Sequence, residues 1–280
     1  MAETACRRPP SCCSGSGGLY ETRTMALRDR IAIISALVLL SGLAWAVTIH
    51  HSGAQASGIA SGGSMTMGMP FSLSSAALYL GLWGIMMVAM MFPSVAPMVV
   101  LFSSVHRNRE PQNNVFGAAW VFAAGYVVLW TLCGVVAYGA DLGVQALPER
   151  FPALRENGHV IAGATLFGAG LYQLTPYKYR CLSHCRSPLG FLLDRWRDGR
   201  WGALRMGLEH GAFCLGCCWS LMTVLFVVGT MNLVWMGALT LLIFVEKVVP
   251  SGVGIGKAAG VGLMALGLLL AWGPHPGAAP

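Results

Sequence analysis

Long apolar stretches separated by short polar segments dominate this chain of 280 residues. A helix of about 20 residues crosses a hydrocarbon core of about 30 Å. Seven stretches approach or exceed that length: residues 31–49, 76–105, 115–140, 159–174, 212–230, 232–249 and 255–272. The fourth stretch is short. The fifth and sixth together are only just long enough for two crossings, so a re-entrant pair is the alternative. The pattern predicts an all-α fold, a polytopic transmembrane helical bundle of about seven spans.

The distribution of Lys and Arg predicts how this bundle is oriented. Of the 18 Lys and Arg residues, 16 lie in segments that would face one side of the membrane. The other two, Arg150 and Arg155, fall in a segment on the opposite side. Because cytoplasmic loops carry the excess of positive charge, the N-terminus is expected in the cytoplasm and the C-terminus outside.

The composition excludes several other classes of protein. Hydrophobic residues make up 55% of the chain and charged residues only 10%, whereas soluble domains carry about 25% charged residues. The net charge of +7 is explained by the orientation signal, so nucleic acid is not an expected partner. The sequence contains no P-loop, dinucleotide-binding fingerprint or HExxH zinc-protease motif, so it does not support an ATP-driven pump.

The first 24 residues differ from the rest of the chain. They are polar and non-periodic, and Met25 begins a short basic segment before the first apolar stretch. We expect residues 1–24 to be a non-structural extension and residues 25–280 to form a single transmembrane domain. A cleaved signal peptide is the other interpretation of residues 25–50, but no convincing cleavage site follows the apolar run.

Cysteine and histidine form the most specific pattern, at the start of the fifth stretch. Spacings of three and four residues place these side chains on one face of a helix. A second Cys/His group lies upstream in the basic loop. Thiolates are soft ligands that favour Cu(I) or Zn(II), although cysteine also packs as a small hydrophobe in buried helices. The candidate metal ligands are His210, Cys214, Cys217 and Cys218, and in the upstream loop Cys181, His184 and Cys185.

Methionines form a second pattern, and their thioethers also prefer Cu(I). One group lies in an uncharged segment after the first span, which follows His50 and His51. The other group lies in the second stretch, where Pro93 and Pro97 would free backbone carbonyls. Ordinary packing is the alternative, above all for this second group. The candidate relay residues are Met65, Met67 and Met69 in the loop, and Met86, Met87, Met90, Met91 and Met98 in the span.

Two charged residues, Glu246 and Lys247, stand side by side near the cytoplasmic end of the sixth stretch. Ionisable groups within a membrane span are usually functional. A solvated ion pair at the membrane surface is an equally good interpretation of this position.

Four segments carry a resemblance to known proteins: residues 84–98 (GIMMVAMMFPSVAPM), 172–190, 207–219 (GLEHGAFCLGCCW) and 231–236. They resemble a bacterial family of predicted metal-binding integral membrane proteins, often labelled copper chaperones. The similarity spans roughly residues 75–250. It implies a bacterial inner (cytoplasmic) membrane location and places the family's Cys/His elements on the seven ligands named above.

These patterns together predict a non-enzymatic protein that binds and relays Cu(I) from outer Met and His ligands to the inner Cys/His cluster. Membrane lipid surrounds it, Zn(II) is the alternative ion, and a soluble copper-binding protein is a possible recipient. One rival function is a membrane thiol–disulfide electron carrier. It would use Cys214 and Cys217 as a C-x-x-C pair at a helix N-terminus, where the dipole favours a reactive thiolate. The other rival is an accessory scaffold subunit whose cysteines only pack.

Overall fold

The computed structural model describes residues 16–56, 73–110, 114–150, 157–230 and 232–272, and these residues form helices and short connections without strands. The all-α prediction is thereby confirmed for the described part of the chain. The helices are α1 (Ser16–Ala56), α2 (Leu73–Arg109), α3 (Val115–Arg150), α5 (Gly158–Gln173), α6 (Pro176–Arg186), α7 (Pro188–Arg195), α8 (Gly199–Val228), α9 (Leu233–Val248) and α10 (Gly252–Trp272).

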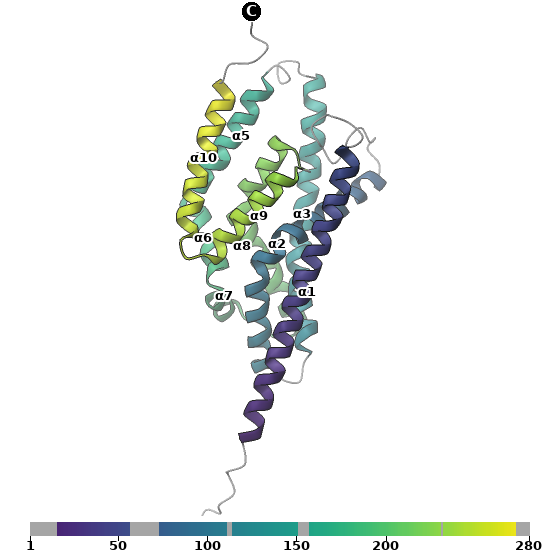
Figure 1. The fold of residues 1–280 in the computed structure, drawn as a ribbon, viewed down its shortest axis with the longest axis vertical. Helices are drawn as coiled ribbons and strands as arrows, with labels where there is room; N and C mark the ends of the chain where they lie inside the picture. Colours follow the sequence, from purple (N-terminus) through teal and green to yellow (C-terminus); the bar gives the residue numbers. More distant parts are fainter. Residues whose placement is uncertain (1–15, 57–72, 111–113, 151–156, 231, 273–280) are drawn as a thin grey trace, which may run out of the picture.

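Each predicted apolar stretch corresponds to one helix, but not all of these helices are long enough to cross a membrane on length and composition alone. Five are: Leu27–Ser52, Leu73–Arg109, Val115–Gly143, Gly199–Val228 and Gly252–Trp272. The remaining two, α5 and α9, have 16 residues each, which is shorter than the roughly 20 residues of a typical span. The first residues of α1 and the last residues of α10 lie at opposite ends of the bundle (Figure 1).

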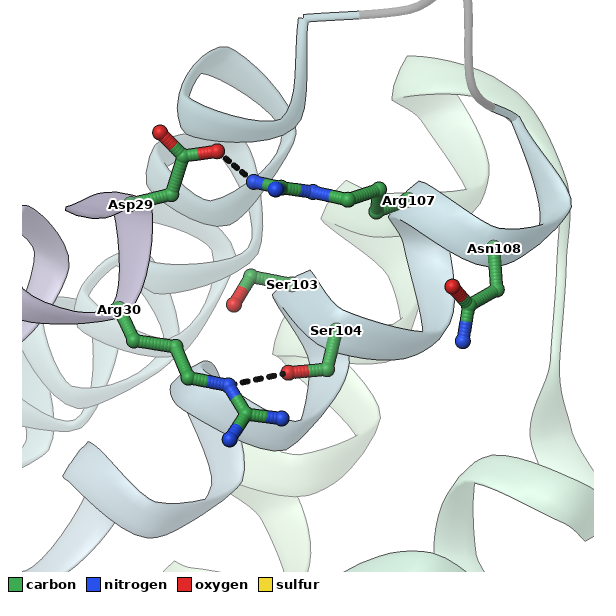
Figure 2. A pocket seen from close by; sticks show the side chains of 6 residues that line it. All are labelled: Asp29, Arg30, Ser103, Ser104, Arg107 and Asn108. Atoms are coloured by element: carbon green, nitrogen blue, oxygen red, sulfur yellow. Dashed lines mark hydrogen bonds and ion pairs between the residues drawn. The ribbon is translucent and has the colours of Figure 1, made fainter. Parts of the chain in front are cut away.

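Polar contacts join α1 to α2 near the end of the bundle where α1 begins. Figure 2 shows Asp29 of α1 paired with Arg107 of α2, and Arg30 donating from Nε to Ser104 Oγ at 3.3 Å. Both segments belong to the part of the chain for which the charge distribution predicts a cytoplasmic location.

Proline inside α2 is compensated by the neighbouring helix. Pro93 has no N–H to donate to the carbonyl of Ala89, one turn earlier. That carbonyl instead accepts hydrogen bonds from Ser41 Oγ at 3.0 Å and Trp45 Nε1 at 3.1 Å, both on α1. Neighbouring helices satisfy freed backbone groups in this way within membranes, so the proline also fixes how α1 packs on α2.

Glycines allow the helices of two pairs to pack with their backbones in direct contact. In the α5–α10 pair, a Cβ at Gly163 would overlap the carbonyl oxygen of Gly267, and a Cβ at Gly267 would overlap that of Gly163. In the α3–α8 pair, a Cβ at Gly207 would overlap the carbonyl of Phe122. Small residues permit this close packing where lipid provides no hydrophobic drive for association. The contact with α3 fixes the position of α8, the helix that carries the cysteines.

The basic segment between α5 and α8 is folded rather than an open loop. Thr175 caps α6, its side chain accepting from the backbone N–H of Lys178, and Pro176 stands at the first helical position. Such caps satisfy donors that a helix start leaves unpaired. Helix α6 packs against α8 and thereby brings the upstream Cys/His group beside the cysteine-bearing helix.

Candidate metal centre

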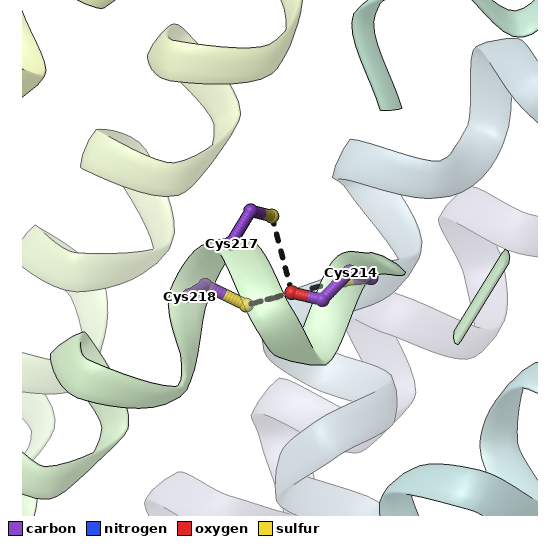
Figure 3. Close-up of side chains that lie close together, drawn as sticks. All are labelled: Cys214, Cys217 and Cys218. Carbon is purple, nitrogen blue, oxygen red and sulfur yellow. Dashed lines mark hydrogen bonds between the residues drawn. The ribbon is translucent and has the colours of Figure 1, made fainter. Parts of the chain in front are cut away.

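Three cysteine thiols gather on one face of α8. The sulfurs of Cys214, Cys217 and Cys218 all lie within 4.8 Å of one another, and the three residues are buried, with 0–1% of their surface exposed. Figure 3 shows Cys217 and Cys218 both directed at the carbonyl oxygen of Cys214, to which their thiols donate at 3.1 and 2.8 Å. The helical spacing read from the sequence therefore produces a compact, dry set of soft ligands.

The sulfur of Cys214 has two polar neighbours from other helices. Lys247 of α9 donates from Nζ to this sulfur at 2.9 Å, and Tyr126 Oη of α3 lies at the same distance. Lys247 also donates to Ser94 Oγ of α2 at 3.3 Å. Positive charge beside a sulfur stabilises an anionic thiolate or the anionic complex that it forms with a metal. Four helices thus meet at the cluster.

Glu246 and Lys247 do not form the solvated pair that their adjacency in sequence allowed. Both residues are buried, with 2% and 8% of their surface exposed, and their side chains have different partners. Glu246 Oε1 lies 2.5 Å from Lys178 Nζ of α6, while Lys247 contacts Cys214. The sequence signal for Lys247 as a site residue was the presence of a lysine within an apolar stretch. No sequence pattern pointed to Tyr126.

His210 is buried among aromatic rings rather than among the three sulfurs. Its ring centroid lies 6.1 Å from that of Tyr126 and 5.3 Å from that of Phe191. Its Nδ1 atom is buried and has no hydrogen-bond partner within the described residues. The imidazole is therefore one helical turn from Cys214, but it is not among the three ligand atoms that the structure brings together.

The upstream ligand group on α6 lies at the edge of the cluster. Cys181, His184 and Cys185 are half-buried. His184 stacks on Phe213 with ring centroids 4.1 Å apart, and its Nδ1 lies 2.9 Å from the carbonyl oxygen of Arg180. Burial raises the pKa of the Cys181 thiol, and the neighbouring Cys217 adds to this rise. The Cys181 sulfur lies against the backbone of α8 at Gly216, the residue before Cys217.

The methionines of α2 belong to the packed core. Their surfaces are 0–2% exposed, and they share one hydrophobic cluster with the three buried cysteines. Packing alone is sufficient to place them there. The residues concerned are Met86, Met87, Met90, Met91 and Met98. The predicted loop ligands Met65, Met67 and Met69 lie outside the described residues, whereas His50 and His51 fall on the last turns of α1.

The C-x-x-C pair does not lie at a helix N-terminus, as the electron-carrier hypothesis supposed. Helix α8 begins at Gly199, about four turns before Cys214 at 3.6 residues per turn. The dipole effect falls off within the first turn, so it does not act on these thiols. All six cysteines among the described residues are free thiols.

The comparison with known families covers most of this bundle. The copper chaperone family PpoB2 matches residues 80–270, a range that begins within α2 and ends within α10. No curated protein and no solved structure matches the chain. The matched range exceeds half of the 280 residues and contains the buried thiols, Lys247 and the α6 ligand group. The resemblance found in the sequence motifs is confirmed, and the chain belongs to the PpoB2 copper chaperone family.

Proposed function

We propose that this protein binds Cu(I) at Cys214, Cys217 and Cys218 and relays the ion within a bacterial inner membrane. The observation that carries this proposal is the placement of three buried sulfurs within 4.8 Å of one another. Thiolates are the soft ligands that select Cu(I), and membership of a copper chaperone family supports a metal-handling role rather than an enzymatic one.

Zn(II) is the alternative ion, and the ligand set favours copper over it. Structural zinc sites are almost always closed by four protein ligands. The cluster supplies three thiols, and a fourth ligand would require either His210 to turn toward them or Cys181 of α6 to move in from its place beside Gly216. Cu(I), in contrast, accepts a low coordination number that two or three of the thiols satisfy.

The remaining candidate ligands form the two ends of the proposed relay. On the outer side, thioethers would take up the ion weakly and reversibly, and the core methionines of α2 would lead it toward the thiols. On the inner side, the half-buried group on α6 would connect the cluster to a soluble copper-binding partner. The outer and core ligands are Met65, Met67, Met69, Met86, Met87, Met90, Met91 and Met98, and the inner ligands are His210, Cys181, His184 and Cys185.

We further propose seven crossings, with α5 and α9 as short spans, the N-terminus in the cytoplasm and the C-terminus outside. A topology reporter fused after residue 108 or within residues 186–200 is expected to give a cytoplasmic signal, because positively charged segments stay inside. Fusions within residues 55–65 or at the C-terminus should give an outside signal. An outside signal at 186–200 would move the α6 ligands to the other face and contradict this orientation.

Replacing both Cys214 and Cys217 with Ser is expected to abolish copper binding. The wild-type protein should hold about one copper ion per chain after anaerobic purification, since two or three thiolates satisfy Cu(I). The double variant should insert normally but contain only background copper. Elemental analysis of the purified proteins, together with their yield from the membrane, measures both effects.

The control for the double variant is Cys133→Ser. Cys133 is a half-buried free thiol on α3 and is not one of the three clustered ligands. This variant should keep its copper. Full copper content in the double variant would contradict the assignment, and loss of zinc instead of copper would identify a structural zinc site.

A further inference from the structure

Gly216 creates the space in which Cys181 meets the cysteine-bearing helix. A Cβ built on Gly216 would overlap the sulfur of Cys181 and press on its Cβ. The thiol of α6 therefore lies directly against the backbone of α8, one residue before Cys217. Any residue larger than glycine at this position would push the Cys181 sulfur away.

Hydrogen bonds hold this contact in place. Tyr172, at the end of α5, donates from its hydroxyl to the carbonyl oxygen of Gly216 at 2.6 Å. The Tyr172 ring also packs edge-on against Trp219, with ring centroids 5.0 Å apart. Tyr179 of α6 donates to the carbonyl of Gln173 at 2.7 Å, which ties the start of α6 to the end of α5. The approach of Cys181 to Gly216 is thus fixed from two helices.

The neighbouring thiols of Cys217 and Cys181 differ in how far they are buried. Cys217 is 1% exposed, whereas Cys181 is half-buried, and Cys185 follows one turn later on α6 with similar exposure. An ion held by the three buried thiols has no direct contact with a soluble partner. Cys181 is the thiol that lies beside the cluster and also reaches toward the surface.

We propose that Cys181 is the transfer ligand through which Cu(I) leaves or enters the buried cluster, and that Gly216 is the residue that positions it. This inference rests on the proposed function. In the step, a Cu–S bond forms to Cys181 as the bond to Cys217 breaks. The proton of the Cys181 thiol passes to the Cys217 sulfur, and copper remains Cu(I) throughout.

The test compares copper content with the rate of copper transfer in the full-length protein in detergent. Gly216→Ala leaves all three buried thiols intact but displaces the Cys181 sulfur, which is the mobile end of a side chain and can turn aside. The variant is expected to hold as much copper as the wild type. It should release copper to the Cu(I) chelator bathocuproine disulfonate at least about tenfold more slowly. Replacing a residue that positions a metal ligand typically has an effect of this size.

Two further variants make the outcome decisive. Cys181→Ser should show the same slow release with full copper content, and it decides the question if Gly216→Ala does not fold. Gly237→Ala on α9, where a Cβ would meet open space, should match the wild type. Wild-type release rates in both Gly216→Ala and Cys181→Ser would overturn the transfer role while leaving the buried site intact. A wild-type protein without copper would overturn the proposed function and this inference with it.

Discussion

Replacing Glu246 with Leu is expected to lower the free energy of unfolding by about 3–5 kcal/mol, the usual cost of removing one partner of a buried ion pair. The carboxylate lies 2.5 Å from Lys178 Nζ, and the two side chains are 3% and 0% exposed. Lys178 also donates to Gln173 Oε1, but a neutral amide cannot replace the lost negative charge. Chemical unfolding in detergent micelles measures the change.

The double variant Lys178→Met with Glu246→Leu tests the physical cause. Because it removes both charges of the pair, it leaves neither of these two side chains as an unpaired ion and should recover most of the stability. A matched control is Arg195→Met, which breaks a contact with Glu209 in which the Arg195 side chain is 46% exposed. Exposed pairs contribute at most about 1 kcal/mol. A Glu246→Leu variant no less stable than the Arg195→Met control would contradict this account.

The Glu246–Lys178 pair also explains a glycine on α10. A Cβ at Gly256 would overlap Glu246 Oε1, so the carboxylate is enclosed by the backbone of α10 as well as by α6. Gln173 at the end of α5 completes the enclosure. The ion pair therefore joins α5, α6, α9 and α10. It also holds the end of α9 on which Lys247 contacts Cys214.

Lys247→Met is expected to weaken copper binding by about 10- to 150-fold, because hydrogen bonds to charged groups contribute about 1.5–3 kcal/mol and 1.4 kcal/mol corresponds to a factor of ten. Two thiolates with Cu(I) carry a net charge of minus one, which the ammonium 2.9 Å from Cys214 Sγ offsets. Methionine keeps most of the buried aliphatic volume but removes this charge. Competition with a Cu(I) chelator of known affinity measures the loss.

Lys257→Met provides the matched control. Lys257 lies on α10 with its Nζ 5.4 Å from the ring centroid of Tyr179, and within the described residues it forms no hydrogen bond with the three clustered thiols. Its replacement should leave copper affinity unchanged. Equal affinity in the wild type and the Lys247→Met variant would show that the ammonium does not stabilise the bound ion.

The local part of the site could be predicted from the sequence, because helical geometry is local. Once residues 212–230 are read as a helix, spacings of three and four residues bring Cys214, Cys217 and Cys218 onto one face. The long apolar stretches likewise predicted where each membrane-length helix lies. The family resemblance also rested on contiguous motifs, which can be read without knowing the tertiary structure.

The parts that were missed depend on contacts between distant residues. Lys247 is 33 positions from Cys214, and Glu246 is 68 positions from Lys178. The start of α8 was also misjudged, since the helix begins at Gly199, before the apolar stretch. The first turns of α8 include polar residues, so hydropathy alone does not show that the helix already includes them.

The sequence by itself determined an all-helical bundle and the grouping of three thiols, because long apolar stretches favour helices, which satisfy their own backbone groups, and helical periodicity groups residues one turn apart. Only the tertiary structure decided which charges serve the site. Adjacent residues on a helix point about 100° apart, so Glu246 and Lys247 face different neighbours. Whether each charge meets a carboxylate, a thiol or water depends on which helices pack around α9, and no local pattern contains that information.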